Sequence, residues 1–469
     1  MIGVLGGGSA GLSVAQAFDN SGYKNYTLVD RNFGKFLPMI YRIPLLGGLA
    51  FGGNDLITKL AITHHQRSVP FFEAKLFGGA SVINGCVASL GSRASWKSIA
   101  TTYSKIDLEN IQIPQGYEVR KSNPGPLDKL LSNALLNQKM QRIDTLFHDQ
   151  EGHGEVCITR GRIFRSNPSF SFNKNCGVRA ELIRLTPRPD CIVVETDAGE
   201  MSFEKVILCL GVRGTLSLLA NSFASYRSKR RIFDHPNFRV KVKMRNNSGI
   251  STLNSIERSS SLKFRAVLDY LIKDMGLLQG PGASYVIYKD FDGDGEVDTK
   301  IQLVNFTEKG RLSSSNSQYR FDDFPGFSFA ITLIKQGSAG FFDGQTKNIS
   351  IEYLADDSEI VLLCRAVKFI EETLSQLSMC DLVDEIIDHH SYSEAYFKEN
   401  VYSGYHLIGG HEMKGGWNLD AGLSLKNDNR IFVVDGSSFQ IFPSSNIALP
   451  ISVLAQRWSE FFMREIINA

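Results

Sequence analysis

A glycine pattern that can bind a dinucleotide opens the chain, as Gly6-x-Gly8-x-x-Gly11. The first glycine allows a tight turn, the second lets the backbone approach a pyrophosphate, and the third lets a helix pack closely on a strand. Asp30 lies 19 residues after Gly11, where an acid binds a ribose hydroxyl. This spacing predicts a site for FAD or NAD, and the candidate contacts are Gly6, Gly8, Ser9, Ala10, Gly11, Asp30 and Arg31.

A second group of polar residues lies in segment 290–298, where carboxylates alternate around a glycine turn. This spacing suits a hard cation such as Ca²⁺. An EF-hand would need Glu at loop position twelve, where this chain has Ile301, so a calcium loop in a β-hairpin is the closer analogue. An acidic hairpin turn without a metal is the alternative that we favour. The candidate ligands are Asp290, Asp292, Asp294 and Asp298.

The elements that would position the glycine pattern are a strand at 2–5, a helix from 12 to about 20 and a strand at 26–30. This order predicts a βαβ unit. From about 238 to 352 the chain changes to short alternating segments, which predict an antiparallel sheet. Helical patterns follow at about 357–377 and 447–467. We therefore predict an α/β fold (α+β, two domains), with a Rossmann-like domain and an antiparallel-sheet substrate domain.

Further segments resemble the glucose–methanol–choline (GMC) oxidoreductases, in the family's order. The loop Gly78-Gly79-Ala80-Ser81-Val82-Ile83-Asn84 is similar to the family's Gly-Gly-Ser-Ser-x-x-Asn and departs from it at Ala80. A buried strand that ends at Gly211 resembles the strand that returns beneath the cofactor in many FAD proteins. The remaining similar segments are Asp234-His235-Pro236, Tyr405-His406-Leu407-Ile408-Gly409, Val433-Val434-Asp435-Gly436 and Pro443-Ser444-Ser445-Asn446.

The resemblance implies a non-covalently bound FAD and an enzyme that oxidises the CH–OH group of a small alcohol, including a sugar or polyol. Molecular oxygen or another acceptor would take the electrons. His406 would accept the hydroxyl proton, and Asn446 would hold the substrate oxygen. We interpret His235 as structural. The further candidate cofactor contacts are Gly78, Gly79, Ser81, Asn84, Gly211, Asp435, Gly436, Asn446 and Ile447.

The same resemblance divides the chain into two discontinuous domains. The FAD-binding domain would comprise 1–105, 151–235 and 401–469, and the substrate-binding cap 106–150 and 236–400. The chain departs from the family where segment 409–413 reads Gly-Gly-His-Glu-Met in place of Gly-Thr-Cys-Arg-Met. Two alternatives therefore stay open, a lyase and an FAD-binding protein without catalysis. An NAD-dependent dehydrogenase is disfavoured, because it has no use for the C-terminal segments.

Composition excludes several other classes of protein. Lys plus Arg is 51 and Asp plus Glu is 49, so no basic excess indicates a nucleic-acid partner. The seven cysteines form no C-x-x-C pair, which argues against a zinc site or a disulfide framework and favours reduced thiols. No apolar run reaches the ~18 residues of a membrane span. We expect a cytoplasmic protein with no membrane span and no signal peptide.

Overall fold

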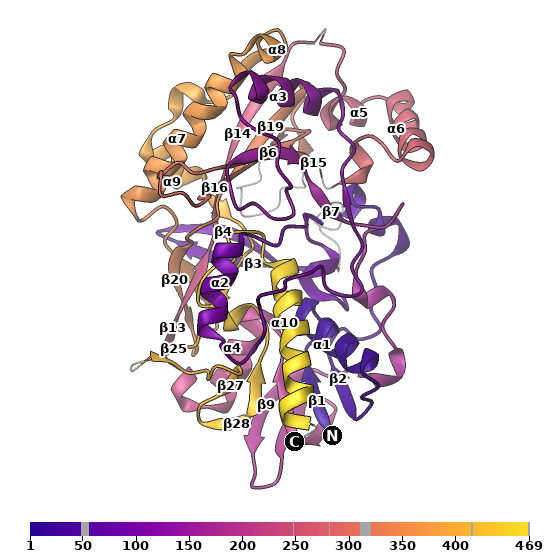
Figure 1. The fold of residues 1–469 in the computed structure, drawn as a ribbon, viewed down its shortest axis with the longest axis vertical. Helices are drawn as coiled ribbons and strands as arrows, with labels where there is room; N and C mark the ends of the chain where they lie inside the picture. Colours follow the sequence, from indigo (N-terminus) through magenta and orange to yellow (C-terminus); the bar gives the residue numbers. More distant parts are fainter. Residues whose placement is uncertain (48–55, 247, 281, 310–319, 414–415, 468–469) are drawn as a thin grey trace.

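The computed structural model describes residues 1–47, 56–246, 248–280, 282–309, 320–413 and 416–467. Both chain ends lie together at the bottom of the molecule in Figure 1, beside the parallel sheet that contains β1. The largest antiparallel sheet lies at the top, and a third sheet lies between them on one side. The chain therefore builds its first and last segments into one half and most of its middle into the other.

The lower half is built on a six-stranded sheet with β1 near its centre. Every residue of β1 is buried, as expected for a parallel strand covered on both faces. Strand β1 pairs in parallel with β2 on one side and β12 on the other, so the strand order reverses at its carboxyl end, where α/β sheets bind ligands. In sheet order the strands are β27 (Ser424–Leu425), β28 (Asp428–Val433), β12 (Lys205–Leu208), β1 (Ile2–Leu5), β2 (Tyr26–Val29) and β8 (Gly177–Val178).

Two helices from opposite ends of the sequence pack together beside this sheet. Helix α1 (Ser9–Asn20) follows β1, and α10 (Ala448–Phe462) runs alongside it in Figure 1. The rings of Phe18 and Phe462 lie 5.9 Å apart across the contact. Helix α4 (Gly211–Ser222) follows β12 and packs on the three-stranded sheet of β9 (Leu182–Pro187), β10 (Ile192–Thr196) and β11 (Gly199–Phe203).

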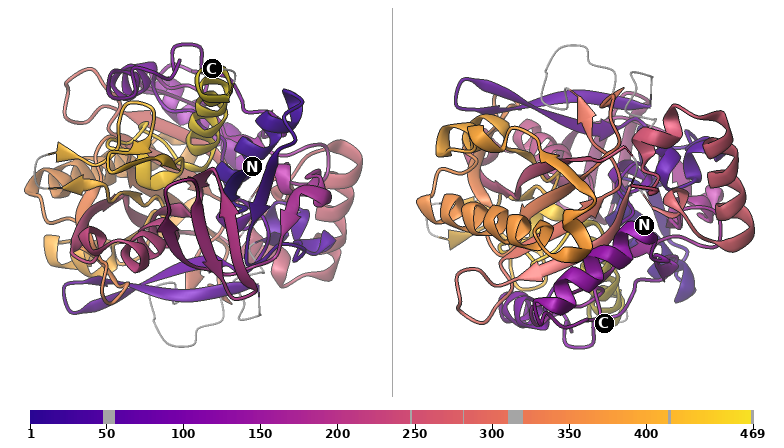
Figure 2. Two further views of the ribbon diagram at one scale, coloured as in Figure 1. Left: turned by 90° about the horizontal axis from the view of Figure 1, so that it is seen from below. Right: turned by 90° about the horizontal axis from the view of Figure 1, so that it is seen from above.

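The upper half is built on an antiparallel sheet, which confirms the prediction for the middle of the chain. Burial alternates along β14, but every residue of β16 and β19 is buried, since helix α7 (Asp357–Leu374) packs against both. Figure 2 shows α7 and α6 (Ser260–Lys273) on opposite sides of this half. In sheet order the strands are β22 (Val383–Ile386), β14 (Pro236–Met244), β19 (Gly326–Leu333), β16 (Thr299–Val304), β15 (Ala283–Lys289) and β6 (Gly152–Glu155), and β23 (Tyr402–Ser403) pairs with β14.

The third sheet is built from segments that are far apart in the sequence, and one residue connects it to the upper sheet. Strand β13 ends at Asp234 and β14 begins at Pro236, so His235 lies at the joint between the two sheets. Strand β24 pairs with β13 and brings the chain after His406 to this joint. In sheet order the strands are β24 (Ile408–Gly409), β13 (Lys229–Asp234), β20 (Ser338–Asp343), β21 (Ile349–Ile351), β3 (Ile57–His64) and β4 (Arg67–Ala74).

The remaining elements are short or lie around these sheets. The helices are α2 (Arg93–Thr102), α3 (Pro126–Asn137), α5 (Leu253–Glu257), α8 (Leu377–Cys380) and α9 (Glu394–Asn400). The strands are β5 (Val119–Lys121), β7 (Cys157–Thr159), β17 (Glu308–Lys309), β18 (Arg320–Phe321), β25 (Glu412–Met413) and β26 (Gly416–Trp417).

The α/β class with two kinds of sheet is confirmed. The domain boundaries stay a prediction, and strand pairing crosses them: β6 pairs with β15, and β21 pairs with β3. The seven cysteines all lie in the described part of the chain, and none forms a disulfide. Among the described residues, no helix combines the length and the apolarity that crossing a lipid bilayer requires.

Candidate active site

His406 lies in the turn between β23 and β24, and a buried aspartate fixes this turn. The backbone N–H of His406 donates to Oδ1 of Asp234 at 2.7 Å. Oδ2 of Asp234 accepts the hydroxyl of Tyr353 at 2.7 Å and that of Ser403 at 2.6 Å. Burial raises the pKa of Asp234, although these hydrogen bonds oppose the rise. Tyr405 adopts a φ of 61°, an unusual conformation for a residue with a side chain, and turns the imidazole of His406 inward.

A continuous hydrogen-bonded chain passes through His406. Nζ of Lys300 donates to Oδ1 of Asn446 at 2.5 Å. Nδ2 of Asn446 lies 2.9 Å from Nε2 of His406, and Nδ1 of His406 lies 2.9 Å from Nδ1 of His235. An ammonium group only donates, so the amide oxygen of Asn446 must face Lys300 and its NH₂ group must donate to His406. His406 therefore accepts at Nε2 and carries its proton on Nδ1, which donates to His235.

The electrostatics of the site keep His406 in this neutral form. Burial, together with the smaller effect of the charge of Lys300, lowers the pKa of His406 to about 3. Burial also lowers the pKa of Lys300 to about 7 and holds the pKa of His235 well below the usual value. At neutral pH, Nε2 of His406 therefore presents a lone pair where the resemblance expects a base.

Sequence reasoning missed Lys300 as a site residue and assigned His235 only a structural role. Lys300 lies in β16 and is 1% exposed. His148 also lies nearby: Nε2 of its ring contacts the carbonyl oxygen of Ser444 at 2.6 Å, and the ring stacks on Tyr288 with centroids 3.9 Å apart. Nothing local to these residues marks them as functional, because pairing of distant strands brings them together.

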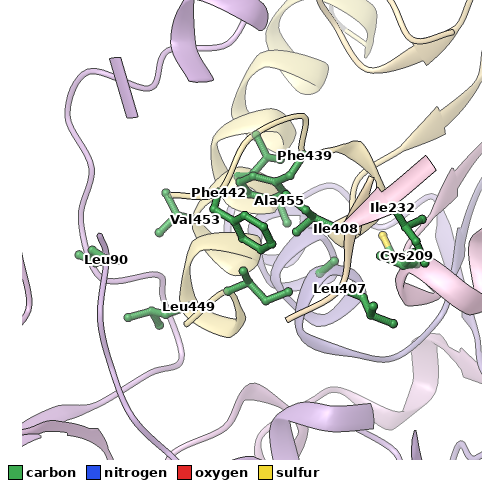
Figure 3. Close-up of a cluster of buried hydrophobic side chains, with 14 of the residues drawn as sticks. Leu90, Cys209, Ile232, Leu407, Ile408, Phe439, Phe442, Leu449, Val453 and Ala455 are labelled. Carbon is green, nitrogen blue, oxygen red and sulfur yellow. The ribbon is translucent and has the colours of Figure 1, made fainter. Parts of the chain in front are cut away.

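Apolar side chains surround the polar chain and limit its contact with water. Figure 3 shows Leu407, Ile408, Phe442 and Leu449 in one buried cluster. The ring of Phe442 lies 3.7 Å from that of His235. Low polarity strengthens the hydrogen bonds of the site and penalises any charged imidazole.

Helix α10 begins at Ala448, two residues after Asn446. Ile447 is its N-cap residue and supplies no side-chain cap, and the first turn contains no acidic residue. The side chain of Asn446 bonds to His406 and Lys300, so it does not cap the helix, which was the alternative role for this residue. The free N–H groups of the first turn leave a partial positive charge beside the site.

The N-terminal glycines have the geometry that a dinucleotide requires. A Cβ at Gly11 would lie 1.8 Å from the carbonyl oxygen of Gly6, and one at Gly6 would lie 2.5 Å from that of Cys209. Among the described residues, the nearest atom that a Cβ at Gly8 would meet is 4.0 Å away, so space stays open before the first turn of α1, which contains Ser9 and Ala10. A phosphate group could therefore approach the N–H groups there.

The acid that follows β2 lies beside this turn. The carboxylate of Asp30 accepts from the N–H groups of Gly7 at 2.8 Å and Asn32 at 2.7 Å. Burial raises the pKa of Asp30. Arg31 points outward to Glu73 at 3.7 Å, so its side chain does not share this arrangement.

The second glycine segment packs on the first. The N–H of Gly78 donates to the carbonyl of Gly7 at 2.9 Å, and a Cβ at Gly79 would lie 3.3 Å from Cα of Gly8. Ser81 lies near Ser9 and Ser452 around the buried hydroxyl of Tyr117, a residue that sequence reasoning missed. The side chain of Asn84 instead accepts the N–H of Cys86 in its own loop at 3.0 Å.

Asp435 fixes two backbone segments, one at the start of α4 and one just before α10. Its carboxylate accepts from the N–H of Gly211 at 2.9 Å, the hydroxyl of Thr215 at 2.6 Å and the N–H of Ser437 at 2.8 Å. Gly436 packs so closely that a Cβ would lie 3.0 Å from the carbonyl oxygen of Leu407. Asp435 thus connects α4 to the segment that precedes α10.

The acidic loop forms only part of the expected cation site. Carboxylate oxygens of Asp290, Asp292 and Asp294 lie within 4.8 Å of one another. Asp298 instead accepts the N–H groups of Phe291 at 2.7 Å and Asp292 at 2.8 Å. Nζ of Lys335 contacts the carboxylates of Asp294 and Asp292. The lysine supplies the positive charge that a metal would bring, which supports the acidic-turn alternative.

No model of a known protein family matches the sequence, and a search of curated proteins finds no match. Among solved structures, a variant of formate oxidase from Aspergillus oryzae RIB40 matches with TM-score 0.81 and 15% identity over 100% of this chain and 98% of that chain. Pyridoxine 4-oxidase from Mesorbium loti has TM-score 0.78 and 12% identity, over 99% of each chain. A fungal aryl-alcohol oxidase has TM-score 0.75 and 12% identity, also over 99% of each chain.

These likenesses extend along the whole chain, so it has the fold of these oxidases. The arrangement that the GMC resemblance implies, a Rossmann-like domain with an antiparallel-sheet substrate domain, is thereby confirmed.

Proposed function

We propose that this chain is a GMC-type, FAD-dependent oxidoreductase that oxidises a CH–OH group, with His406 as the general base. The observation that carries the proposal is the pair of His406 and Asn446, in which Nε2 of a neutral imidazole lies 2.9 Å from an amide NH₂ group beside the first turn of α10. Oxidases on the same fold, named for formate, pyridoxine and aryl alcohols, support a small organic substrate. Molecular oxygen is the electron acceptor that their names favour.

The glycine cradle supports FAD as the cofactor. Gly8 leaves open space, and Gly78 and Gly79 pack directly beside it, so one extended ligand could contact both segments. Gly6, Gly8, Ser9, Ala10 and Gly11 would hold its phosphates, and Asp30 its ribose. When bound, FAD would accept the electrons and the carbon-bound hydrogen of the alcohol.

The chain's own residues would move the proton and hold the substrate oxygen. The substrate hydroxyl would replace the NH₂ group of Asn446 as the donor to Nε2 of His406, which takes the proton. Asn446 would then donate to the substrate oxygen as its charge changes, while Lys300 holds the amide by its oxygen. His235 accepts from Nδ1 of His406 and so keeps Nε2 unprotonated before the reaction.

A flavoprotein without net redox turnover, either a lyase or a silent FAD-binding protein, is the second candidate. The direct bond between Asn446 and His406 favours it, because this bond must open before a substrate can reach Nε2. A lyase would need His406 but would show no reduction of FAD by the substrate.

The test is the visible spectrum of the purified protein, followed by anaerobic addition of alcohols, sugars and hydroxy acids. We expect flavin absorption bands that one compound bleaches, and a loss of about 10²–10⁴-fold in the bleaching rate for His406→Ala. His411→Gln is the matched control, since His411 is also buried and neutral, with a pKa lowered by burial to about 3, but bonds to Tyr226 and Ser437. A protein that binds no FAD after incubation would refute the proposal.

A further inference from the structure

Lys300 is buried, is a cation below about pH 7, and has one close polar contact among the described residues, the neutral amide of Asn446. In the part of the chain that the structure describes, no carboxylate forms an ion pair with its Nζ, and burial is the single cause that shifts its pKa. Buried charges in proteins are usually paired, because desolvation is unfavourable. An unpaired ammonium beside a reaction site therefore indicates a ligand that supplies the missing negative charge.

Among the residues that the structure describes, the groups around Lys300 offer no internal counter-ion. His406, His235 and His148 all feel its charge, and burial keeps the pKa of each of the three imidazoles low, so they are neutral. The carboxylate that contacts His406 is that of Asp234, which accepts from the N–H of His406 and from the hydroxyls of Tyr353 and Ser403. The site therefore has a positive end at Lys300 and a neutral acceptor at His406.

A single amide group separates these two ends. The oxygen of Asn446 bonds to Lys300 and its nitrogen bonds to His406, so Nζ and Nε2 lie one amide apart. Asn446 is half-buried, whereas Lys300 is 1% and His406 is 8% exposed, so a ligand would reach both ends across the face of this amide. A carboxylate and a hydroxyl on adjacent carbons have a separation that suits this spacing.

We propose that the substrate is a small 2-hydroxy acid, whose carboxylate binds the ammonium of Lys300 while its hydroxyl donates to Nε2 of His406. This inference rests on the proposed function and names its substrate class. The hydroxyl proton passes to His406, and the carbon-bound hydrogen leaves with two electrons to FAD, so the 2-hydroxy acid becomes a 2-oxo acid. Lys300 pairs with the carboxylate in substrate and product alike and thus sets specificity.

Two matched pairs of ligands test this assignment: glycolate against ethylene glycol, and lactate against 1,2-propanediol. Each pair keeps a carbinol and differs in the carboxylate. Binding is followed by the shift in melting temperature and by the flavin difference spectrum, and turnover by anaerobic bleaching. The variants are Lys300→Met, which removes the charge, and Lys300→Arg, which keeps it. Lys335→Met serves as a control, since that lysine contacts the acidic loop instead.

We expect an acid to bind at least about tenfold more tightly than its diol, in line with one well-placed ion pair. Lys300→Met should remove this preference, while Lys300→Arg and Lys335→Met should retain it. Binding should weaken as the pH rises above about 7, because Lys300 loses its proton while the ligand stays ionised.

Three results would overturn the inference. They are equal binding of acid and diol by the wild type, no binding of the acid at millimolar concentration, and a Lys300→Met variant that loses affinity for acid and diol equally. The last result would mean that Lys300 only positions Asn446. If a diol bleaches the flavin of the wild type and of Lys300→Met alike, the proposed function stands, and only the inference about the substrate class fails. If no FAD binds, the proposed function fails, and the melting-temperature shift with glycolate still tests the anion site.

Discussion

Replacing Lys300 by methionine should make the folded protein more stable, although it removes a residue of the site. Burial lowers the pKa of Lys300 from 10.5 to about 7. Near pH 7 this difference destabilises the fold by about 4 kcal/mol. The variant also loses the hydrogen bond to Asn446, which offsets about 2 kcal/mol of the gain. The net gain of about 2 kcal/mol should raise the melting temperature of this 469-residue chain by about 2 °C.

The pH dependence distinguishes this cause from better packing. Between about pH 7 and 10.5 the unfolded lysine binds a proton that the folded one does not, so the wild type gains stability as the pH rises. The methionine variant lacks this effect, so its advantage should vanish near pH 9 and shrink by about 3 kcal/mol in all by pH 10. The assay is the melting temperature of both proteins across this range, at the same FAD content.

Lys335→Met is the control with the opposite sign. Burial lowers the pKa of Lys335, but its hydrogen bond to Asp294 and the charges of Asp292 and Asp294 outweigh this and raise the pKa overall. Its removal should therefore destabilise the protein. A Lys300→Met variant that melts below the wild type near pH 7, or that keeps a constant difference up to pH 10, would refute the description of Lys300 as an unpaired buried charge.

Three further predictions follow from the geometry. Gly8→Val should abolish flavin absorbance without unfolding the protein, because the new side chain would occupy open space. Gly11→Ala should instead destabilise the fold, because its Cβ would lie 1.8 Å from a carbonyl oxygen. Flavin retained in Gly8→Val would contradict the proposed glycine cradle. Burial lowers the pKa of His406 to about 3, so below about pH 6.5 the unfolded chain binds a proton that the folded chain does not bind. From pH 7 to pH 5 the wild type should therefore lose about 2 kcal/mol more of its free energy of unfolding than His406→Gln, as measured by thermal melts. Calcium or EDTA should leave the melting temperature unchanged, because Lys335 neutralises the acidic loop; a rise with Ca²⁺ would establish a metal site.

Local sequence was enough to predict the cofactor cradle and the fold class. The roles of Gly6, Gly8 and Gly11 depend on backbone geometry within a few residues, and strand–turn–helix spacing reports such geometry directly. The starts of α7 and α10 lie within one residue of the predicted helical segments at 357–377 and 447–467, whereas the two helices end earlier, at Leu374 and Phe462. His406 and Asn446 were reached through resemblance to a family, and the structure brings them to 2.9 Å.

Tertiary structure alone decided the electrostatics of the site. Alternation along β16 places Lys300 on the opposite face from Ile301, yet every residue of this strand is buried, and Nζ of Lys300 contacts Asn446 from the C-terminal segment. His235 joins His406 because β13 pairs with β24, a contact between segments far apart in the sequence. Burial and long-range strand pairing set the pKa values of Lys300 and His406, and the local spacing of residues in the sequence predicts neither of these two causes. The sequence by itself therefore predicted where a dinucleotide would bind, and only the folded chain determined which charged and neutral groups lie together in the proposed site.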